Sequence, residues 1–225
     1  MKGPLHAGSL GWQLCMLAVL SAAVSFGAAS PAQAASPARV LTLDALGTAA
    51  GLLQADPCAS ADVQMGGGGA NNMVLLNNQV NGGLTTRGMV QVNQIPGPRV
   101  APVNCAFASS SCVGCQTLSV ALQIDLISRT AAFVAPRNVA RAQNVGCQGC
   151  QTFARAMQYV IQVDDPTSME PEISQLEQAM NDQLRALQTD RSLTLDQAMT
   201  QIDGVLAQFQ DLAASLDDQR SQAVD

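Results

Sequence analysis

The sequence of 225 residues predicts an α+β fold in which a β-meander is followed by two duplicated strand–CxGC–helix units and a C-terminal helical hairpin. Three observations predict this fold. Short apolar runs separated by glycine and proline turns lie between residues 73 and 108, as in a meander of strands. A Cys-x-Gly-Cys-Gln-Thr motif then occurs twice. Apolar residues recur at helical spacing from residue 164 onward.

Composition divides the chain into a signal peptide (1–34), a flexible N-terminal arm with a Gly-rich linker (35–72), an α+β domain with the duplicated CxGCQT units (73–163) and an acidic helical hairpin (164–225). Lys2, an apolar run and the small residues Ala32-Gln33-Ala34 form the pattern of a cleaved export signal. The alternative is a retained membrane anchor, for which the apolar run is short. We therefore expect a secreted or extracytoplasmic chain with no membrane span after cleavage.

Removal of the predicted signal peptide would leave no histidine, lysine or tryptophan, because His6, Lys2 and Trp12 are the sole residues of their types. This excludes Ser-His-Asp and Cys-His catalysis, Schiff-base chemistry and histidine metal ligation within the mature chain. An acid-catalysed hydrolase would need paired carboxylates. We interpret the adjacent pair Asp164-Asp165 as solvated residues beside a helix, so we assign no catalytic residue.

Charge is distributed unevenly along the chain. Between residues 35 and 163 there are seven arginines and four acids, whereas thirteen acids and three arginines follow from residue 164. Nucleic-acid binding requires a dense basic patch interleaved with aromatic side chains, and only 3% of this chain is aromatic. The acidic C-terminal segment would also repel phosphate, so we exclude nucleic acid as a partner.

The arm has little regular structure in its pattern. Leu41 to Leu53 has the composition of a short helix, which Gly47 and Gly51 weaken. Gly66 to Gly69 predict a flexible linker. The alternative, a phosphate-binding loop, would need a preceding strand and a following Lys-Ser/Thr helix start, and neither is present.

Three strands are predicted between residues 73 and 108. The first, Met73 to Val80, ends at Asn81-Gly82, a dipeptide that closes tight hairpin turns. Leu84 to Ile95 is the expected return strand. The third runs from Arg99 to Ala108 after a Pro-Gly-Pro break, and Pro102 within it favours an edge position or a bulge.

The motif Cys112-Val-Gly-Cys115-Gln-Thr recurs as Cys147-Gln-Gly-Cys150-Gln-Thr at an offset of 35 residues. The similarity continues beyond the cysteines, which predicts an internal duplication. Asn138 to Val145, between the two motifs, is predicted to be a strand. The glycine within each motif would permit the tight backbone that leads from strand to helix.

After each motif, apolar residues recur mostly every three or four positions and predict a helix; these residues are Leu118, Ala121, Leu122 and Leu126, then Phe153, Ala156, Met157, Val160 and Ile161. Gln123 and Gln158 occupy matching positions on these predicted helices. We interpret them as solvated side chains. The alternative is that each pairs with the other unit.

Two helices are predicted after residue 164. Thr167 to Glu170 is a capping box with Pro171 in the first turn, and Thr194 to Gln197 is a second capping box. The apolar seams that follow suit two antiparallel helices. We favour a helical hairpin docked on, or projecting from, the main domain. The alternative is a coiled coil through which the chain binds an unidentified protein partner or a second copy.

The paired C-x2-C-x-T motifs and the Ser-Leu-Thr-Leu turn between the C-terminal helices resemble a group of exported bacterial proteins, chiefly actinobacterial, that carry duplicated C-x2-C-x-T helices. The resemblance covers Met73 to Leu216 and implies the fold and an extracytoplasmic location. It implies no activity. A zinc-peptidase label attached to some of these proteins does not transfer, because an H-E-x-x-H site needs histidines that the mature chain lacks.

An even number of cysteines in an exported chain predicts disulfides, and six lie outside the signal peptide: Cys58, Cys105, Cys112, Cys115, Cys147 and Cys150. We expect local bridges within each C-x-G-C motif. Chain entropy alone would favour longer loops, either between the two motifs or from Cys58 to Cys105.

Two other interpretations of the paired motifs stay open. Cys112, Cys115, Cys147 and Cys150 have ligand spacing compatible with a four-thiolate zinc site. A C-x-x-C pair at a helix start also suits thiol–disulfide exchange. The sequence therefore favours a disulfide-stabilised, non-enzymatic structural or binding protein without a cofactor. Zinc handling and redox activity are the alternatives, and the ligand, partner and oligomeric state are not encoded in any pattern.

Overall fold

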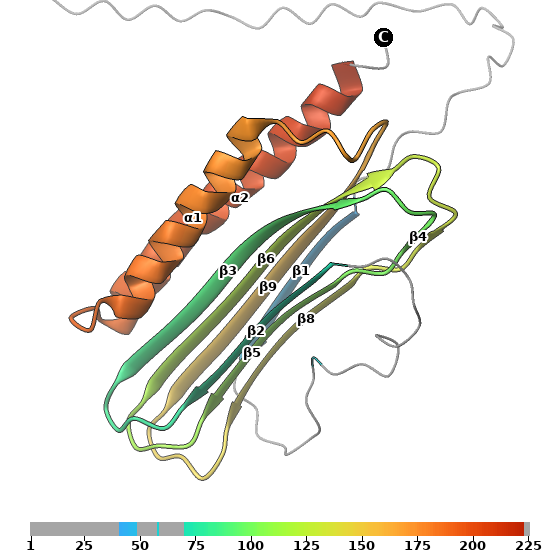
Figure 1. Cartoon of the computed structure of the whole chain (residues 1–225). Helices are drawn as coiled ribbons and strands as arrows, with labels where there is room; N and C mark the ends of the chain where they lie inside the picture. Colours follow the sequence, from blue (N-terminus) through green and yellow to red (C-terminus); the bar gives the residue numbers. More distant parts are fainter. Residues whose placement is uncertain (1–40, 49–57, 59–69, 223–225) are drawn as a thin grey trace, which may run out of the picture. The chain divides into compact units, whose positions relative to one another are not determined.

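The structure, a computed structural model, describes residues 41–48, Cys58 and residues 70–222, which all belong to the unit Ala38–Asp225. The expected signal peptide and the linker at Gly66 to Gly69 lie outside the described residues. The class is α+β, as predicted, with strands first and two helices at the C-terminal end (Figure 1).

The strands form a coil of three turns, and each turn contributes one strand to each of two sheets: β2 (Asn71–Asn78) and β3 (Leu84–Ile95), β5 (Val103–Ser110) and β6 (Gln116–Ser128), then β8 (Arg137–Asn144) and β9 (Gln151–Val163). The order is β2-β5-β8 in one sheet and β1-β9-β6-β3 in the other. All of these pairs are parallel except β1 (Leu41–Thr48), which runs antiparallel to β9. Two short strands, β4 (Arg99–Val100) and β7 (Phe133–Val134), pair where the chain returns to the three-stranded sheet.

The predicted β-meander is wrong. Asn81-Gly82 does turn the chain, with Gly82 at φ 65°, but β2 and β3 belong to different sheets and each pairs with the next turn of the coil. The turn therefore forms a corner between sheets instead of a hairpin. The predicted strand from residue 99 is also interrupted, because Pro102 separates β4 from β5.

The segments after the CxGC motifs are strands, not helices. β6 is buried along almost its whole length, because one face lies inside the coil and the other lies under the C-terminal helices. A strand buried on both faces is apolar at nearly every position, and such a run imitates helical spacing. The predicted helix at Leu41 to Leu53 is likewise wrong at its start, where β1 completes the sheet.

The interior of the coil is narrow and lined by small side chains. Ala106 and Ala108 from one sheet face Ala121, Ala154 and Ala156 from the other, and all five are buried. Side chains from one sheet reach the main chain of the other, as where Ser119 Oγ donates to Val74 O at 3.0 Å. The described interior is therefore filled by the protein's own groups.

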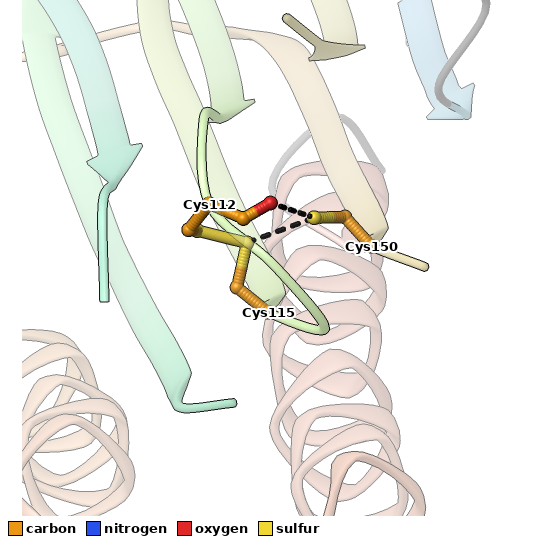
Figure 2. Close-up of side chains that lie close together, drawn as sticks. All are labelled: Cys112, Cys115 and Cys150. Carbon is orange, nitrogen blue, oxygen red and sulfur yellow. Dashed lines mark hydrogen bonds between the residues drawn. A yellow bond between two sulfur atoms is a disulfide. The ribbon is translucent and has the colours of Figure 1, made fainter. Parts of the chain in front are cut away.

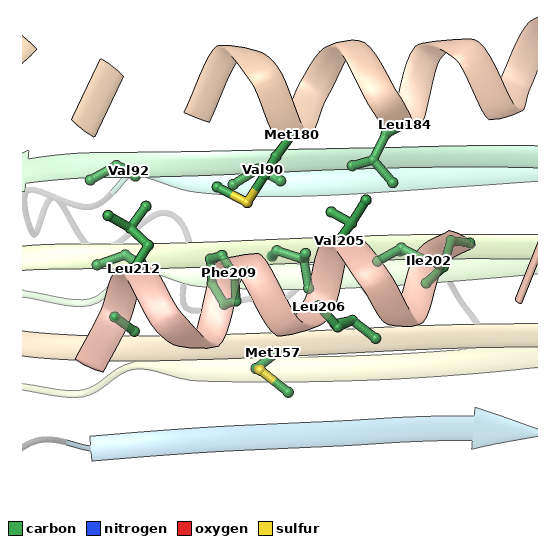
Figure 3. Close-up of a cluster of buried hydrophobic side chains, with 14 of the residues drawn as sticks. Val90, Val92, Met157, Met180, Leu184, Ile202, Val205, Leu206, Phe209 and Leu212 are labelled. Atoms are coloured by element: carbon green, nitrogen blue, oxygen red, sulfur yellow. The ribbon is translucent and has the colours of Figure 1, made fainter. Parts of the chain in front are cut away.

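The two helices, α1 (Pro171–Thr189) and α2 (Leu195–Gln222), pack on the outer face of the β3-β6-β9 strands. Their apolar stripes meet side chains of the sheet, including Val90, Val92 and Met157, and Phe209 is completely buried among them (Figure 3). Among the described residues, neither helix has the length and apolarity needed to cross a membrane.

The two predicted capping boxes have different outcomes. At the start of α2, Thr194 N donates to Gln197 Oε1 at 2.9 Å and Gln197 N donates to Thr194 Oγ1 at 3.3 Å, so this box is confirmed. The first box does not form. Thr167 N instead donates to Asp165 Oδ1 at 2.9 Å, and α1 begins at Pro171.

Candidate functional site

The two CxGC motifs occupy the same corner of consecutive turns, between β5 and β6 and between β8 and β9. Each motif closes a local disulfide, with Cα atoms 5.9 Å apart for Cys112–Cys115 and 6.1 Å apart for Cys147–Cys150. Parallel pairing of β6 with β9 stacks one motif on the other. The predicted local disulfide bonds are therefore present. The stacking of one disulfide on the other follows from the pairing of β6 with β9, which only the tertiary structure shows.

Glycine at the centre of each motif lets the corner form. Gly114 and Gly149 have φ of 63° and 65°, a left-handed conformation that glycine adopts without steric cost. Gly114 N donates to Gln148 O at 2.8 Å, and in the turn before, Gly82 N donates to Val113 O at 2.9 Å. Hydrogen bonds thus continue the ladder from strand to strand through the corners.

The four sulfur atoms form one cluster. Cys115 Sγ lies 3.0 Å from Cys150 Sγ (Figure 2). It also lies 3.8 Å from Cys147 Sγ. Cys112 and Cys115 are buried, whereas Cys147 and Cys150 are partly exposed. The cluster therefore has an accessible outer disulfide packed directly on a buried inner one.

Of the six predicted site cysteines, four meet in this cluster and two lie elsewhere. Cys58 and Cys105 form a third disulfide, with Cα atoms 5.7 Å apart, and pack with Val103 on the three-stranded sheet. Within the described residues, the cluster is the group with metal-ligand geometry, because the Sγ atoms of Cys112, Cys115 and Cys150 lie within 4.8 Å of one another. Disulfide sulfurs do not ligate zinc as thiolates do, so this use would require reduction.

The motif threonines support the cluster from inside the coil. Ser110 Oγ lies 2.6 Å from both Thr117 Oγ1 and Thr152 Oγ1, and Thr152 Oγ1 donates to Asn144 Oδ1 at 2.6 Å. All but Asn144 are buried. These hydroxyls join consecutive turns directly behind the cysteines, which gives the threonine of CxGCQT a structural role.

A second polar group lies deeper in the coil, around Asp125. Its Oδ1 accepts hydrogen bonds from Asn93 Nδ2 at 2.9 Å and Gln123 Nε2 at 2.8 Å, and its Oδ2 accepts one from Gln158 Nε2 at 2.9 Å. Asp125, Gln123 and Gln158 are completely buried, so the prediction of solvated glutamines is wrong. Burial raises the pKa of Asp125 to about 6, although the three donors oppose the shift.

An asparagine ladder runs through the other sheet and was not recognised in the sequence. Asn72, Asn104 and Asn138 are paired in register on β2, β5 and β8. Asn104 Nδ2 donates to Ala121 O and to Met157 O, both at 2.9 Å, and so joins the two sheets. The three asparagines are separated by unequal numbers of residues, so they do not follow the constant spacing of the CxGC motifs.

The acidic pair at residues 164 and 165 is not arranged for acid–base catalysis. Asp164 forms an ion pair with Arg129 at 3.0 Å, and Asp165 accepts hydrogen bonds from Thr167 that lower its pKa. A general acid would instead need a raised pKa. Both acids are therefore engaged in local surface contacts.

A groove of about 490 Å³ between β3 and α1 is a further concavity among the described residues, and its lining includes Arg87, Glu177 and Arg185. Partial burial raises the pKa of Glu177, against a main-chain hydrogen bond from Val92 that lowers it. The groove contains none of the predicted site residues.

Comparison with protein-family models, with curated proteins and with solved structures gives no match to this chain. The geometry of the sulfur cluster and of the buried ladders therefore supplies the functional argument.

Proposed function

We propose that this chain is an extracytoplasmic, non-enzymatic structural or binding module built on a disulfide-clamped coil of parallel strands. The observation that carries the proposal is the stacking of two disulfides at the corners of consecutive turns, in front of a buried hydroxyl cluster. A turn of such a coil cannot bury its inner face alone and depends on its neighbours. Disulfide bridges at the corners stiffen the coil, and the coil presents its outer surfaces to solvent or to a partner.

The filled interior supports a structural role. Alanines occupy facing positions of the two sheets, and amide side chains satisfy main-chain groups across the gap. Pockets that hold small ligands are usually hollow and mostly apolar, with a few convergent polar groups. The inside of this coil is instead packed with its own side chains, so any partner would bind on an outer face.

An oxidising compartment is the setting that three disulfides favour, which agrees with the export signal expected in the sequence. We also infer that the first turn is a third copy of the motif without its cysteines. Val80-Asn-Gly82-Gly-Leu-Thr85 aligns with the CxGCQT copies through the register of β3 and β6, and Gly82 has the same left-handed conformation as Gly114.

The test is the intact mass of the exported protein after alkylation, with and without reductant. Six cysteines that resist alkylation until a reductant is added would support three structural disulfides. Free thiols in the untreated protein would overturn the proposal. So would four thiols that become accessible only after chelation and denaturation.

Zinc handling is the second candidate, and one observation favours it. Zinc–sulfur bonds of about 2.3 Å place tetrahedral ligands roughly 3.8 Å apart. The Sγ atoms of Cys112, Cys115 and Cys150 lie within 4.8 Å of one another, and reduction of the bridges would free them as thiolates near this spacing. Native mass spectrometry of the reduced protein with zinc tests this: one bound ion that is lost in a Cys115→Ser variant would support a site, and no bound ion would exclude it.

A further inference from the structure

The two stacked disulfides differ in access, and sulfur atoms of the two bridges lie close together. Cys150 belongs to the partly exposed outer bridge, and Cys115, which is completely buried, belongs to the inner one. Their Sγ atoms are 3.0 Å apart (Figure 2). This is closer than the 3.8 Å between Cys115 Sγ and Cys147 Sγ. A thiolate released at Cys150 would therefore already lie against a disulfide sulfur.

We propose that the two stacked disulfides form a relay in which the outer disulfide accepts two reducing equivalents and passes one of them to the inner disulfide through Cys150 and Cys115. An external dithiol first reduces Cys147–Cys150 to two thiols and is itself oxidised to a disulfide. The Cys150 thiolate then attacks Cys115 Sγ. The Cys115–Cys150 bond forms, the Cys112–Cys115 bond breaks, and the proton lost by Cys150 is taken up at Cys112.

Before the reaction the four cysteines form two disulfides, and after it they form one disulfide and two thiols. The external dithiol supplies both electrons. The second step is an isomerisation without net oxidation or reduction, as in ordinary thiol–disulfide exchange. The product has one thiol from each bridge, at Cys112 and Cys147, so one of the two reducing equivalents has moved from the outer bridge to the inner one.

The backbone accommodates the new bond. Cys115 and Cys150 directly precede the paired residues Gln116 and Gln151 of adjacent parallel strands. Neighbouring strands lie about 4.8 Å apart, and disulfides span Cα separations of roughly 4.4 to 6.8 Å. A bond between consecutive turns therefore fits the existing register without displacement of the strands.

The released thiol also has a partner. Cys112 Sγ lies 3.1 Å from Asn78 O, which can accept a hydrogen bond from the thiol once the inner bridge opens. In the first turn of the coil, Val80 and Gly83 occupy the positions that correspond to Cys112 and Cys115. Because neither residue has a sulfur atom, thiol–disulfide exchange cannot continue beyond the inner disulfide. The relay thus has an accessible entry and a buried end.

The matched variants Cys147→Ser and Cys150→Ser test the inference, because each removes the outer bridge and leaves one thiol. The proteins are held at pH 8, quenched with acid, alkylated with N-ethylmaleimide and mapped by peptide mass spectrometry. In Cys147→Ser we expect the label mainly on Cys112 and a Cys115–Cys150 bridge. In Cys150→Ser we expect the label on Cys147 with Cys112–Cys115 intact.

Label confined to Cys150 in the first variant, with the inner bridge unchanged, would overturn the relay. Wild-type protein treated with one equivalent of dithiothreitol supplies the second measurement. The relay predicts label on Cys112 and Cys147, whereas label on Cys147 and Cys150 contradicts it. The inference rests on the proposed disulfides, and their failure is recognised separately, as label taken up by wild-type protein before any reductant is added.

Discussion

Asp125 is a single carboxylic acid that the coil buries completely among amide groups. Asn93, Gln123 and Gln158 each donate one hydrogen bond to it, yet no cation among the described contacts balances its charge. Desolvation therefore dominates and raises its pKa from the ordinary 3.8 to about 6. A raised pKa means that the folded chain binds the proton more tightly than the unfolded chain does.

We predict that Asp125 makes stability depend on pH in a defined direction. Its stabilising contribution is fully present below pH 4, where the unfolded group is also protonated, and is lost as the pH rises through about 6. Two pKa units correspond to roughly 3 kcal/mol. Asp125→Asn removes the titration, so wild type should lose about this much stability relative to the variant between pH 4 and pH 8.

Urea unfolding of both proteins at the two pH values measures this difference. The control is Asp211→Asn, an exposed change on α2, which should leave the pH dependence of wild type unaltered. An Asp125→Asn variant whose stability follows wild type at both pH values would show that Asp125 does not titrate in this range.

Two glycines offer opposite predictions for the same substitution. Gly149→Ala should reduce the free energy of unfolding by about 1–2 kcal/mol, because the new side chain must adopt a left-handed backbone at φ 65°. Gly204→Ala should increase it by roughly 0.5–1 kcal/mol, because Gly204 lies within α2 and an added Cβ would meet no atom within 4 Å. Thermal and urea unfolding compare the pair, and equal effects would contradict the assigned conformations.

At the scale of elements, the open edge of β3 is covered by α1. Asn181 Oδ1 accepts a hydrogen bond from Val90 N at 2.9 Å and Asn181 Nδ2 donates to Val90 O at 3.0 Å, so one side chain replaces a neighbouring strand. Gly88 lets the helix approach, since a Cβ there would lie 2.8 Å from Leu184 Cδ2. Such covering protects an edge from pairing with other chains.

We predict that Asn181→Ala destabilises the protein by about 2 kcal/mol, because two main-chain groups of Val90 lose their partner in a partly buried place. Gln175→Ala, an exposed change on the same helix, is the control and should have little effect. Urea unfolding gives the stabilities, and light scattering would detect the association expected of an uncovered strand. A variant as stable as its control would refute the role of Asn181.

Element type was predictable where local chemistry decides it, as at the capping box that opens α2. It was not predictable for β6. Leu118, Leu122 and Leu126 satisfy a spacing of four, which a helix explains, and equally a spacing of two, which a strand explains. The contacts that choose the strand come from β3, β9 and the helices, and these lie far away in the sequence.

At the scale of the whole molecule, three disulfides close loops of very different size. Cys58–Cys105 spans a sequence separation of 47, whereas each CxGC bridge spans only 3. In the chain-entropy model, loops of these sizes are worth about 4 and about 2 kcal/mol. The long bridge thus contributes most to global stability, while the short ones fix the corners.

We therefore predict that the double variant Cys58→Ser/Cys105→Ser loses about 4 kcal/mol and that Cys112→Ser/Cys115→Ser loses about 2 kcal/mol. Chemical unfolding of both variants under oxidising conditions provides the comparison. A larger loss from the CxGC variant would mean that the corner, with its stacked sulfurs, contributes more than loop closure.

The relation to exported bacterial proteins and a protein partner for the C-terminal helices stay predictions, since no comparison bears on them.

The sequence by itself determined the features that depend on neighbours along the chain. The strand at Leu84 to Ile95, the capping box at Thr194 and the local bridges of the two CxGC motifs all follow from turn residues, periodicity and short spacings. Each is decided within a few residues.

Only the tertiary structure decided how the strands pair and therefore which residues fill the interior of the coil. Leu84 lies beside Gln116, and Gln116 beside Gln151, so each pair of neighbouring parallel strands joins residues more than thirty positions apart. That pairing buries Gln123, Gln158 and Asp125 and brings Cys115 against Cys150. No local pattern contains this information, because hydrogen bonds between parallel strands depend on which turn of the chain returns to lie beside which.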